Sequence, residues 1–394
     1  MRVWFQKDNP VEERIAALIF ASMQNEIIPS EEALLGRRHQ SDDGRVPNGG
    51  DGKLDIYLFD FPPPPPDEEM KDAATVGYPE NRIPSMGCPG RPSYIAVNLQ
   101  WARTASPDGL ANIMAHEYFH VLQNTFDMLG SCNFYTGITE GTAEYVMHHV
   151  YPNSNDEHDW YLFSEDGSLS MLTEDYSTWP FYMYMTKKLG DKSLLTLLTN
   201  FASYNAFEAL DQTLPGGLKK HWVEYATLQW NQSPLDDSFL QWDNYTAVPG
   251  RGGRQSDGHL VPIKPEKVIL DANGQYRYEM KMRLPPMTRE IYAFDLSNEE
   301  IRSIAISNPV RDNIGKMNVK LLGRKKGTTQ FEEILWGDHD RKDYLYCLDK
   351  KDEAFDLIVL VAANYQHNRN EQTIVTTPNF RANNQGCYGF KGTI

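Results

Sequence analysis

The spacing of apolar residues divides the chain into a helical stretch and a strand-rich stretch. From Ser106 to about Trp230, apolar residues recur every three or four positions, which is the period of an amphipathic helix. Beyond residue 263 they alternate with polar residues in short segments separated by turns, which is typical of β-strands. Two further strands are predicted nearer the N-terminus, at 54–59 and 93–101. The pattern therefore predicts an α+β protein.

Local signals set the ends of the predicted helices. The first helix covers 10–35, with Asn9 as its N-cap and Glu12 completing a capping box. Its apolar stripe consists of Ile15, Leu18, Ile19 and Met23. A second helix follows Ser106, which is a preferred N-cap residue. Asp191 is the expected cap of one of the later helices, which are predicted at 138–150, 178–189, 191–201 and 216–230.

The composition changes after residue 235. The stretch 236–262 is rich in Gly, Pro, Asp and Ser, which favours a linker. A chain of 394 residues also exceeds the size of one ordinary domain. We therefore predict a strand-and-helix domain over 1–235 and a β-sandwich of the jelly-roll kind over 263–394.

The net charge of the chain limits the kinds of binding partner that we expect. The formal net charge is −16 and the pI is about 5.1. Such a chain is repelled by nucleic acid and by anionic membranes, so neither is an expected partner. No apolar run approaches the roughly eighteen residues of a membrane-spanning helix. These features predict a soluble protein.

None of the four cysteines belongs to a CxxC pair, which argues against a zinc knuckle. Two cysteines fall on each side of the predicted linker. We therefore expect disulfides from Cys88 to Cys132 and from Cys347 to Cys387, with four unpaired buried thiols as the alternative. Disulfides indicate a secreted or cell-surface protein, whose signal segment we expect to be absent from this sequence.

The segment HEYFH carries the main chemical signal. It places His116 and His120 four positions apart, so both rings lie on one face of the predicted helix. Two imidazoles in that arrangement can bind one zinc ion, and Glu117 between them can take a proton from the water that the metal activates. A catalytic zinc site needs a third protein ligand and one open position.

The segment GITEGTAEYV offers the third ligand. Glu140 and Glu144 lie on one face of a predicted helix, where two like charges repel each other. Glu140 follows His120 by twenty positions, and a turn near Gly130 can fold its helix back against the first. We predict that Glu140 is the third zinc ligand and that Glu144 accepts the remaining ring N–H of a ligating histidine. The zinc charge and the polarised imidazole would offset the repulsion.

Other residues offer alternatives. A metzincin-type site would need glycine at position 123 and a third histidine ligand at position 126, where Gln123 and Phe126 stand. Asp127, just past that helix, is an alternative ligand, and His148 either supports a ligand or is simply exposed to solvent. Asp51 and Asp55 faintly resemble a Ca²⁺-binding loop but lack the closing glutamate, so an ordinary glycine turn is the preferred interpretation.

HEYFH, followed twenty positions later by the glutamate of TEGTAEY, resembles the gluzincin superfamily of zinc metallopeptidases. The interval is similar to that of thermolysin-like peptidases, and EGTAEY is similar to secreted bacterial peptidases of the hyicolysin and immune inhibitor A kind. The strong match covers about residues 93–200. The resemblance implies a strand-plus-helix half and a helical half around the metal-bearing helix. It also implies that the strand at 93–98 is the edge along which substrate lies.

The superfamily commonly supplies a Tyr or His from its helical half to stabilise the oxyanion. The segment EDYSTWPFYMYMTKKLG offers Tyr176, Tyr182 and Tyr184. The last two lie in the apolar part of a predicted helix, so core packing is expected for both. Tyr176 precedes that helix and is the predicted donor, with Tyr182 and His221 as alternatives.

Residues and resemblance together predict a zinc-dependent endopeptidase that acts on a protein or peptide substrate, with Glu117 as general base. An aminopeptidase is the nearest alternative. A second alternative, from another class, is a catalytically silent surface protein that keeps the zinc fold and binds partners through its β-sandwich. The intact Glu117 favours the enzyme, because a silent relative has no need of the base.

Overall fold

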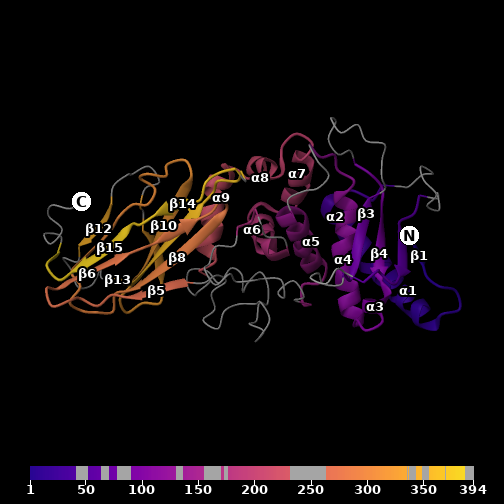
Figure 1. Ribbon diagram of the computed structural model, residues 1–394, viewed down its shortest axis with the longest axis horizontal. Helices are drawn as coiled ribbons and strands as arrows, with labels where there is room; N and C mark the ends of the chain where they lie inside the picture. Colours follow the sequence, from indigo (N-terminus) through magenta and orange to yellow (C-terminus); the bar gives the residue numbers. More distant parts are fainter. Residues whose placement is uncertain are drawn as a thin grey trace. The chain divides into compact units, whose positions relative to one another are not determined.

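The computed structural model describes residues 1–40, 52–63, 71–77, 90–129, 136–154, 170–172, 176–230, 263–334, 336, 343–347, 355–368 and 370–386. Within them the chain is a mixture of helices and strands, which confirms the α+β prediction (Figure 1). The chain divides into two compact units. Unit 1 comprises Met1–Tyr161 and Glu174–Thr213, and unit 2 comprises Leu162–Thr173 and Leu214–Ile394.

The sheet of unit 1 has four described strands in the order β1-β2-β4-β3. Three of them, β1 (Arg2–Trp4), β2 (Asp55–Phe59) and β4 (Ser93–Asn98), run parallel, whereas β3 (Ala73–Gly77) runs antiparallel to β4. Strand β4 therefore pairs on both sides, and β3 forms the edge of the described sheet. The implied edge strand at 93–98 is wrong, because the sequence pattern shows that a strand is apolar but not which strands flank it.

Strand β4 is also shorter than the predicted 93–101. The side chain of Asn98 accepts a hydrogen bond from the backbone N–H of Gln100, at 3.1 Å, and thereby caps a short helix, α3 (Leu99–Ala102). Asn is a good N-cap residue, and its capping bond ends the extended backbone here.

The predicted helix over 10–35 is present, but it contains a π-helical turn. It consists of α1 (Pro10–Ser22), η1 (Met23–Ile27) and α2 (Ile28–Leu35). The Asn9 side chain accepts hydrogen bonds from the first turn, as predicted. Leu18, which was expected in the apolar stripe, is instead exposed, whereas the other three members are buried.

Helix α4 (Pro107–Gln123) is the centre of unit 1 and packs against β3, β4, α1 and α5 (Thr136–Val150). Ser106 caps it as predicted, because its Oγ accepts a hydrogen bond from the Gly109 N–H at 3.0 Å. On α5, a Cβ at Gly141 would overlap the hydroxyl of Thr178 and the ring of Tyr182. Glycine at that position therefore permits the close approach of α5 to the segment that follows it.

That segment begins with a 3₁₀ turn, η3 (Tyr176–Thr178), and continues as α6 (Trp179–Leu189) and α7 (Lys192–Asn200). Both helices lie where they were predicted. Asp191 is the N-cap residue of α7, as predicted, but its side chain makes no capping hydrogen bond. A further helix, α8 (Ala206–Thr213), was not predicted.

Unit 2 contains two larger sheets and a two-stranded ribbon, β14-β7 (Ile374–Thr376 and Met282–Leu284). The first sheet has the order β11 (Phe331–Ile334), β10 (Met317–Lys325), β13 (Phe355–Asn364), β8 (Thr288–Asp295) and β5 (Ile263–Lys267). The second has the order β12 (Tyr344–Cys347), β9 (Ser303–Ile306), β15 (Asn379–Asn383) and β6 (Gln275–Glu279). Side chains from both sheets share one core, in which Phe294 and Phe380 stack with ring centroids 3.9 Å apart.

Helix α9 (Gly217–Leu228) belongs to unit 2, where it packs against β13 and β10. Trp222 of this helix donates its indole N–H to the carbonyl of Thr288, at 3.2 Å. The two units therefore divide between Thr213 and Leu214, whereas the sequence placed this helix in a first domain that ends at residue 235. The jelly-roll connectivity of the predicted sandwich stays a prediction.

Cys347 on β12 is disulfide-bonded. Cys88, Cys132 and Cys387 lie outside the described residues, so both predicted pairings stay predictions. None of the helices in the described part of the chain has the length and apolar character needed to cross a membrane.

Candidate metal centre

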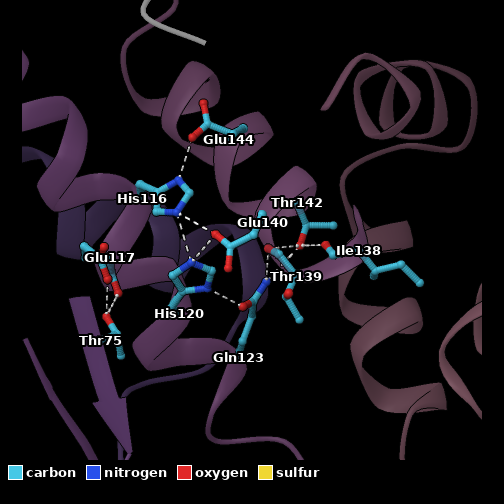
Figure 2. Close-up of polar contacts among 10 residues, drawn as sticks. All are labelled: Thr75, His116, Glu117, His120, Gln123, Ile138, Thr139, Glu140, Thr142 and Glu144. Atoms are coloured by element: carbon cyan, nitrogen blue, oxygen red, sulfur yellow. Dashed lines mark hydrogen bonds and ion pairs between the residues drawn. The ribbon is translucent and has the colours of Figure 1, made fainter. Parts of the chain in front are cut away.

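Three predicted ligand atoms converge between α4 and α5 (Figure 2). The Nε2 atoms of His116 and His120 lie 3.0 Å apart. Oε2 of Glu140 lies 3.1 Å from the first of these nitrogens and 3.0 Å from the second. Atoms at these separations could hold one metal ion between them.

The secondary structure accounts for this convergence. His116 and His120 stand one turn apart on α4, which places their rings one above the other on a single face. Helix α5 packs along that face and brings Glu140 opposite both rings. The His116 side chain is 3% exposed but that of Glu140 is 22% exposed, so solvent reaches the triangle from the glutamate side.

His120 is held in the tautomer that leaves Nε2 free to bind a metal. Its Nδ1 lies 2.7 Å from Oε1 of Gln123, which can only accept a hydrogen bond. The Gln123 amide group in turn donates to the carbonyl of Thr139 and to the hydroxyl of Thr142, at 3.0 and 2.8 Å. When His120 is neutral, its proton therefore lies on Nδ1, and the lone pair of Nε2 points to the centre.

Glu144 occupies the corresponding position beside the other histidine. Its Oε1 lies 2.9 Å from Nδ1 of His116, and both side chains are 3% exposed. This is the contact that the spacing of Glu140 and Glu144 predicted, with one carboxylate in the triangle and the next one turn behind it (Figure 2). A buried carboxylate at Nδ1 also raises the basicity of Nε2.

The centre attracts positive charge. Burial alone would lower the pKa of His116, but hydrogen bonds and charges from Glu140 and Glu144 outweigh it and raise that pKa well above its ordinary value. The pKa of His120 is raised as well, because the charge of Glu140 outweighs the effect of burial. Burial opposes ionisation of Glu140, yet the two imidazoles hold its pKa far below the ordinary value. The two imidazoles and the carboxylate together therefore favour a bound cation.

Glu117, the predicted general base, lies beside the triangle on the same helix. Oγ1 of Thr75, on β3, lies 2.7 Å from Oε2 of Glu117 and also 2.7 Å from its backbone oxygen. The residue is largely buried, at 6% exposure, next to the edge strand of the described sheet. Its carboxylate therefore has a defined orientation.

The predicted oxyanion donor is also near the centre. The ring of Tyr176 lies next to the ring of His116, with centroids 5.7 Å apart. Tyr182 and Tyr184 are fully buried, as expected for core residues, and the Tyr182 hydroxyl donates to the carbonyl of Gly137. His221 lies on α9 in unit 2, where its Nε2 is 3.1 Å from the Pro215 carbonyl oxygen.

The weaker alternatives have other partners. Asp127 accepts a hydrogen bond from the Gly90 N–H, at 2.8 Å. Asp55 forms an ion pair with Arg2 and accepts a hydrogen bond from Trp4, and Asp51 lies outside the described residues. His148, for which exposure to solvent was one of two interpretations, is buried, and its ring stacks on Trp179.

Sequence reasoning missed two residues of the centre. Gln123 was read only as a departure from the metzincin pattern, although its position three residues after His120 places it within reach of that ring. Thr75 stands in the short segment AATVG, whose small residues gave no distinct strand signal. Only the pairing of β3 with β4 brings it to Glu117.

In the described part of the chain, His116, His120 and Glu140 are the one group of three or more such side chains that could hold a metal ion. Comparisons with protein-family models and with curated proteins find no match to this chain. The functional interpretation therefore depends on the geometry of the centre.

Proposed function

We propose that this protein is a zinc-dependent peptidase, with His116, His120 and Glu140 as the metal ligands. One observation carries the proposal: two imidazole nitrogens and a carboxylate oxygen lie within 3.1 Å of one another. Two histidines and one glutamate are a ligand set of catalytic zinc sites, which keep the fourth position open. Without a cation, these three atoms would crowd their lone pairs together in a partly buried site.

A zinc ion held by His116, His120 and Glu140 would supply a Lewis acid for hydrolysis of a peptide bond. Glu117 accepts the proton of the attacking water and later donates it to the leaving amine. Its position next to His116 in the sequence, on a rigid helix, keeps it close to the reacting atoms. Gln123 and Glu144 hold the protons on the far ring nitrogens, so the ligating nitrogens stay neutral.

Tyr176 is the proposed donor to the oxyanion that forms on the substrate carbonyl. Its ring lies beside that of His116, on the 3₁₀ turn that precedes α6. A phenol can rotate its O–H toward a developing negative charge, and such donors typically contribute 10² to 10³ in kcat.

Strand β3 is the proposed docking site for substrate. It is the outermost described strand of its sheet, and it lies beside α4. An extended peptide can add to such an edge through main-chain hydrogen bonds, with its side chains alternating between the two faces. This arrangement suits a peptidase because every peptide has the same backbone.

The proposal is tested with a diverse peptide library, incubated with the protein in the presence and absence of a metal chelator. We expect cleavage that is lost with chelator and restored by zinc. Glu117→Gln should retain zinc but lose hydrolysis, because an amide cannot accept the water proton. The exposed residue Glu208 provides a control, because Glu208→Gln should leave cleavage unchanged. A wild-type protein that binds zinc but cleaves no peptide would point to the silent surface protein.

A further inference from the structure

Thr75 contacts Glu117 from a separate element. The two residues are 42 positions apart in the chain, and they meet because β3 lies beside α4. Thr75 is the central residue of the five-residue strand β3 and pairs there with Ile95 of β4. Figure 2 shows its hydroxyl directed at Glu117, close to the two metal-binding histidines. The contact thus joins the edge of the sheet to the metal-bearing helix.

We propose that Thr75 is the positioning residue for Glu117, an inference that rests on the proposed peptidase function. A glutamate has three rotatable side-chain bonds, and holding it in one conformation costs entropy. A hydrogen bond from a hydroxyl to a carboxylate is stronger than one between neutral groups. Threonine is restricted at χ1, so the donor itself is fixed by the strand. Thr75 therefore selects one orientation of the base before substrate binds.

The hydroxyl of Thr75 is within hydrogen-bond distance of two oxygens of the same residue. Its Oγ1 lies 2.7 Å from Oε2 of Glu117 and 2.7 Å from the Glu117 backbone oxygen. A hydroxyl has one proton to donate, so it donates to one of these oxygens at a time. Either hydrogen bond keeps the Thr75 side chain against Glu117.

The position of Thr75 also links the base to the proposed substrate strand. Substrate that pairs with β3 takes its register from the backbone of this strand. The same strand supplies the hydroxyl that orients Glu117. The scissile bond and the base are therefore aligned through one element, and a small displacement of β3 would move both together.

Two variants separate the hydroxyl from the shape of the side chain. Thr75→Val removes the hydroxyl and keeps the β-branched volume, whereas Thr75→Ser keeps the hydroxyl. We expect Thr75→Val to lower kcat about 10- to 100-fold, as loss of a hydrogen bond to a charged group implies. KM and zinc content should not change, and Thr75→Ser should restore most of kcat.

Thr213→Val is the matched control. It removes the hydroxyl of another threonine of unit 1, which is buried whereas Thr75 is partly buried. Among the described residues, the Thr213 hydroxyl contacts only Asn200 and the carbonyl of Ala209. Its kcat should equal that of the wild type. Equal losses of kcat in Thr213→Val and Thr75→Val would overturn the inference, because the effect would then be one of general stability.

Crystal structures of the metal-free proteins provide a readout that does not depend on activity. Glu117 should occupy one conformation in the wild type and in Thr75→Ser, and several in Thr75→Val. Unchanged kcat and an unchanged Glu117 in Thr75→Val would overturn the positioning role and leave the peptidase function intact. If the wild type cleaves no peptide, the peptidase function fails, and the crystal structures still decide whether Thr75 holds this side chain.

Discussion

At the scale of single residues, each histidine of the proposed metal site contacts a side chain that is not a proposed ligand. Gln123 accepts a hydrogen bond from the ring of His120, and Glu144 contacts the ring of His116. If the site binds zinc as proposed, the two carboxylates of α5 have different roles, although only one turn separates them. Metal affinity can distinguish these roles, because a ligand contributes more to it than a residue that orients a ligand.

We expect Glu140→Ala to remove most of the bound zinc, since it deletes one of three protein ligands. Glu144→Ala should weaken zinc binding only about 10- to 100-fold, as changes behind a ligand typically do. Metal analysis and competition with a chelator distinguish the two. Loss of zinc in Glu144→Ala with retention in Glu140→Ala would reverse the assignment.

Tyr176→Phe should lower kcat by about 10² to 10³ with little change in KM or zinc content, because the donor acts only in the transition state. Tyr225→Phe is the control. It removes a hydroxyl on α9 of unit 2 that accepts a hydrogen bond from the Gln229 amide group, so it should leave kcat unchanged. Steady-state kinetics of the two variants test the assignment, which fails if Tyr176→Phe is as active as the wild type.

The residues that sequence could predict are those whose chemistry is visible in a short segment. The proposed roles of His116, Glu117 and His120 could be predicted from their spacing on one helix. The proposed role of Glu140 could be predicted from its helical spacing to Glu144 and from its position twenty residues after His120. Thr75 has no such signal, because its role comes from a strand pairing across 42 positions. The spacing of three residues between His120 and Gln123 indicates that the two side chains can contact each other. No sequence motif indicated a role for the amide group of Gln123.

At the scale of elements, the centre depends on how closely α5 packs against the chain that follows it. Thr178 and Tyr182 both donate hydrogen bonds to the carbonyl of Gly137, in the first turn of α5. Gly141, one turn later, leaves space for their side chains. These contacts fix the helix that carries Glu140, so packing remote from the metal determines the position of a ligand.

Gly141→Ala should destabilise the protein. Alanine favours a helix by up to about 1 kcal/mol over glycine, but overlap with Thr178 and Tyr182 in a packed core typically costs about 1 to 3 kcal/mol. The free-energy cost of the overlap should exceed the gain in helix propensity. A displacement of α5 should also weaken zinc binding. Thermal unfolding and zinc competition measure the two effects. A variant more stable than the wild type would show that a methyl group fits at position 141 without steric overlap.

The positions of elements with a strong apolar period could be predicted from the sequence. The elements against which they pack could not. α4 and α6 lie where the pattern placed them, because each has the apolar period of a helix. The period of α9 is as clear, but it shows only that the helix has an apolar face. Whether that face meets helices or a sheet is decided by segments more than 60 residues later, such as β8.

At the scale of the whole molecule, the acidity of the chain and the basicity of the centre act in the same direction. The net charge of −16 disfavours further negative charge, and the pKa values of His116 and His120 are raised, so both favour a bound proton or metal cation. A zinc ion competes with those protons, because ligating imidazoles must be neutral. Metal binding and pH are therefore linked.

The raised pKa values of the two histidines determine how stability and zinc affinity change with pH. A histidine whose pKa is raised on folding stabilises the metal-free protein fully below the unfolded pKa, about 6.5, and this stabilisation is lost as pH rises through the folded pKa. We therefore expect the metal-free protein to lose stability above about pH 6.5, while zinc affinity rises. Thermal unfolding with and without zinc across this range tests both. His120→Gln should reduce the pH dependence, and a wild type whose metal-free stability rises there would contradict the linkage.

The route of the chain between the two units decides how the protein can be shortened. Residues 170–172 belong to unit 2 and pack there, with the Ser170 hydroxyl bonded to the Pro286 carbonyl, before the chain returns to complete unit 1. No single cut therefore separates the units. A fragment that ended at residue 235 would keep α9 but lose the strands against which it packs, exposing Leu218 and Trp222. Such a fragment would contain every residue of the metal centre and still present an apolar surface that promotes aggregation.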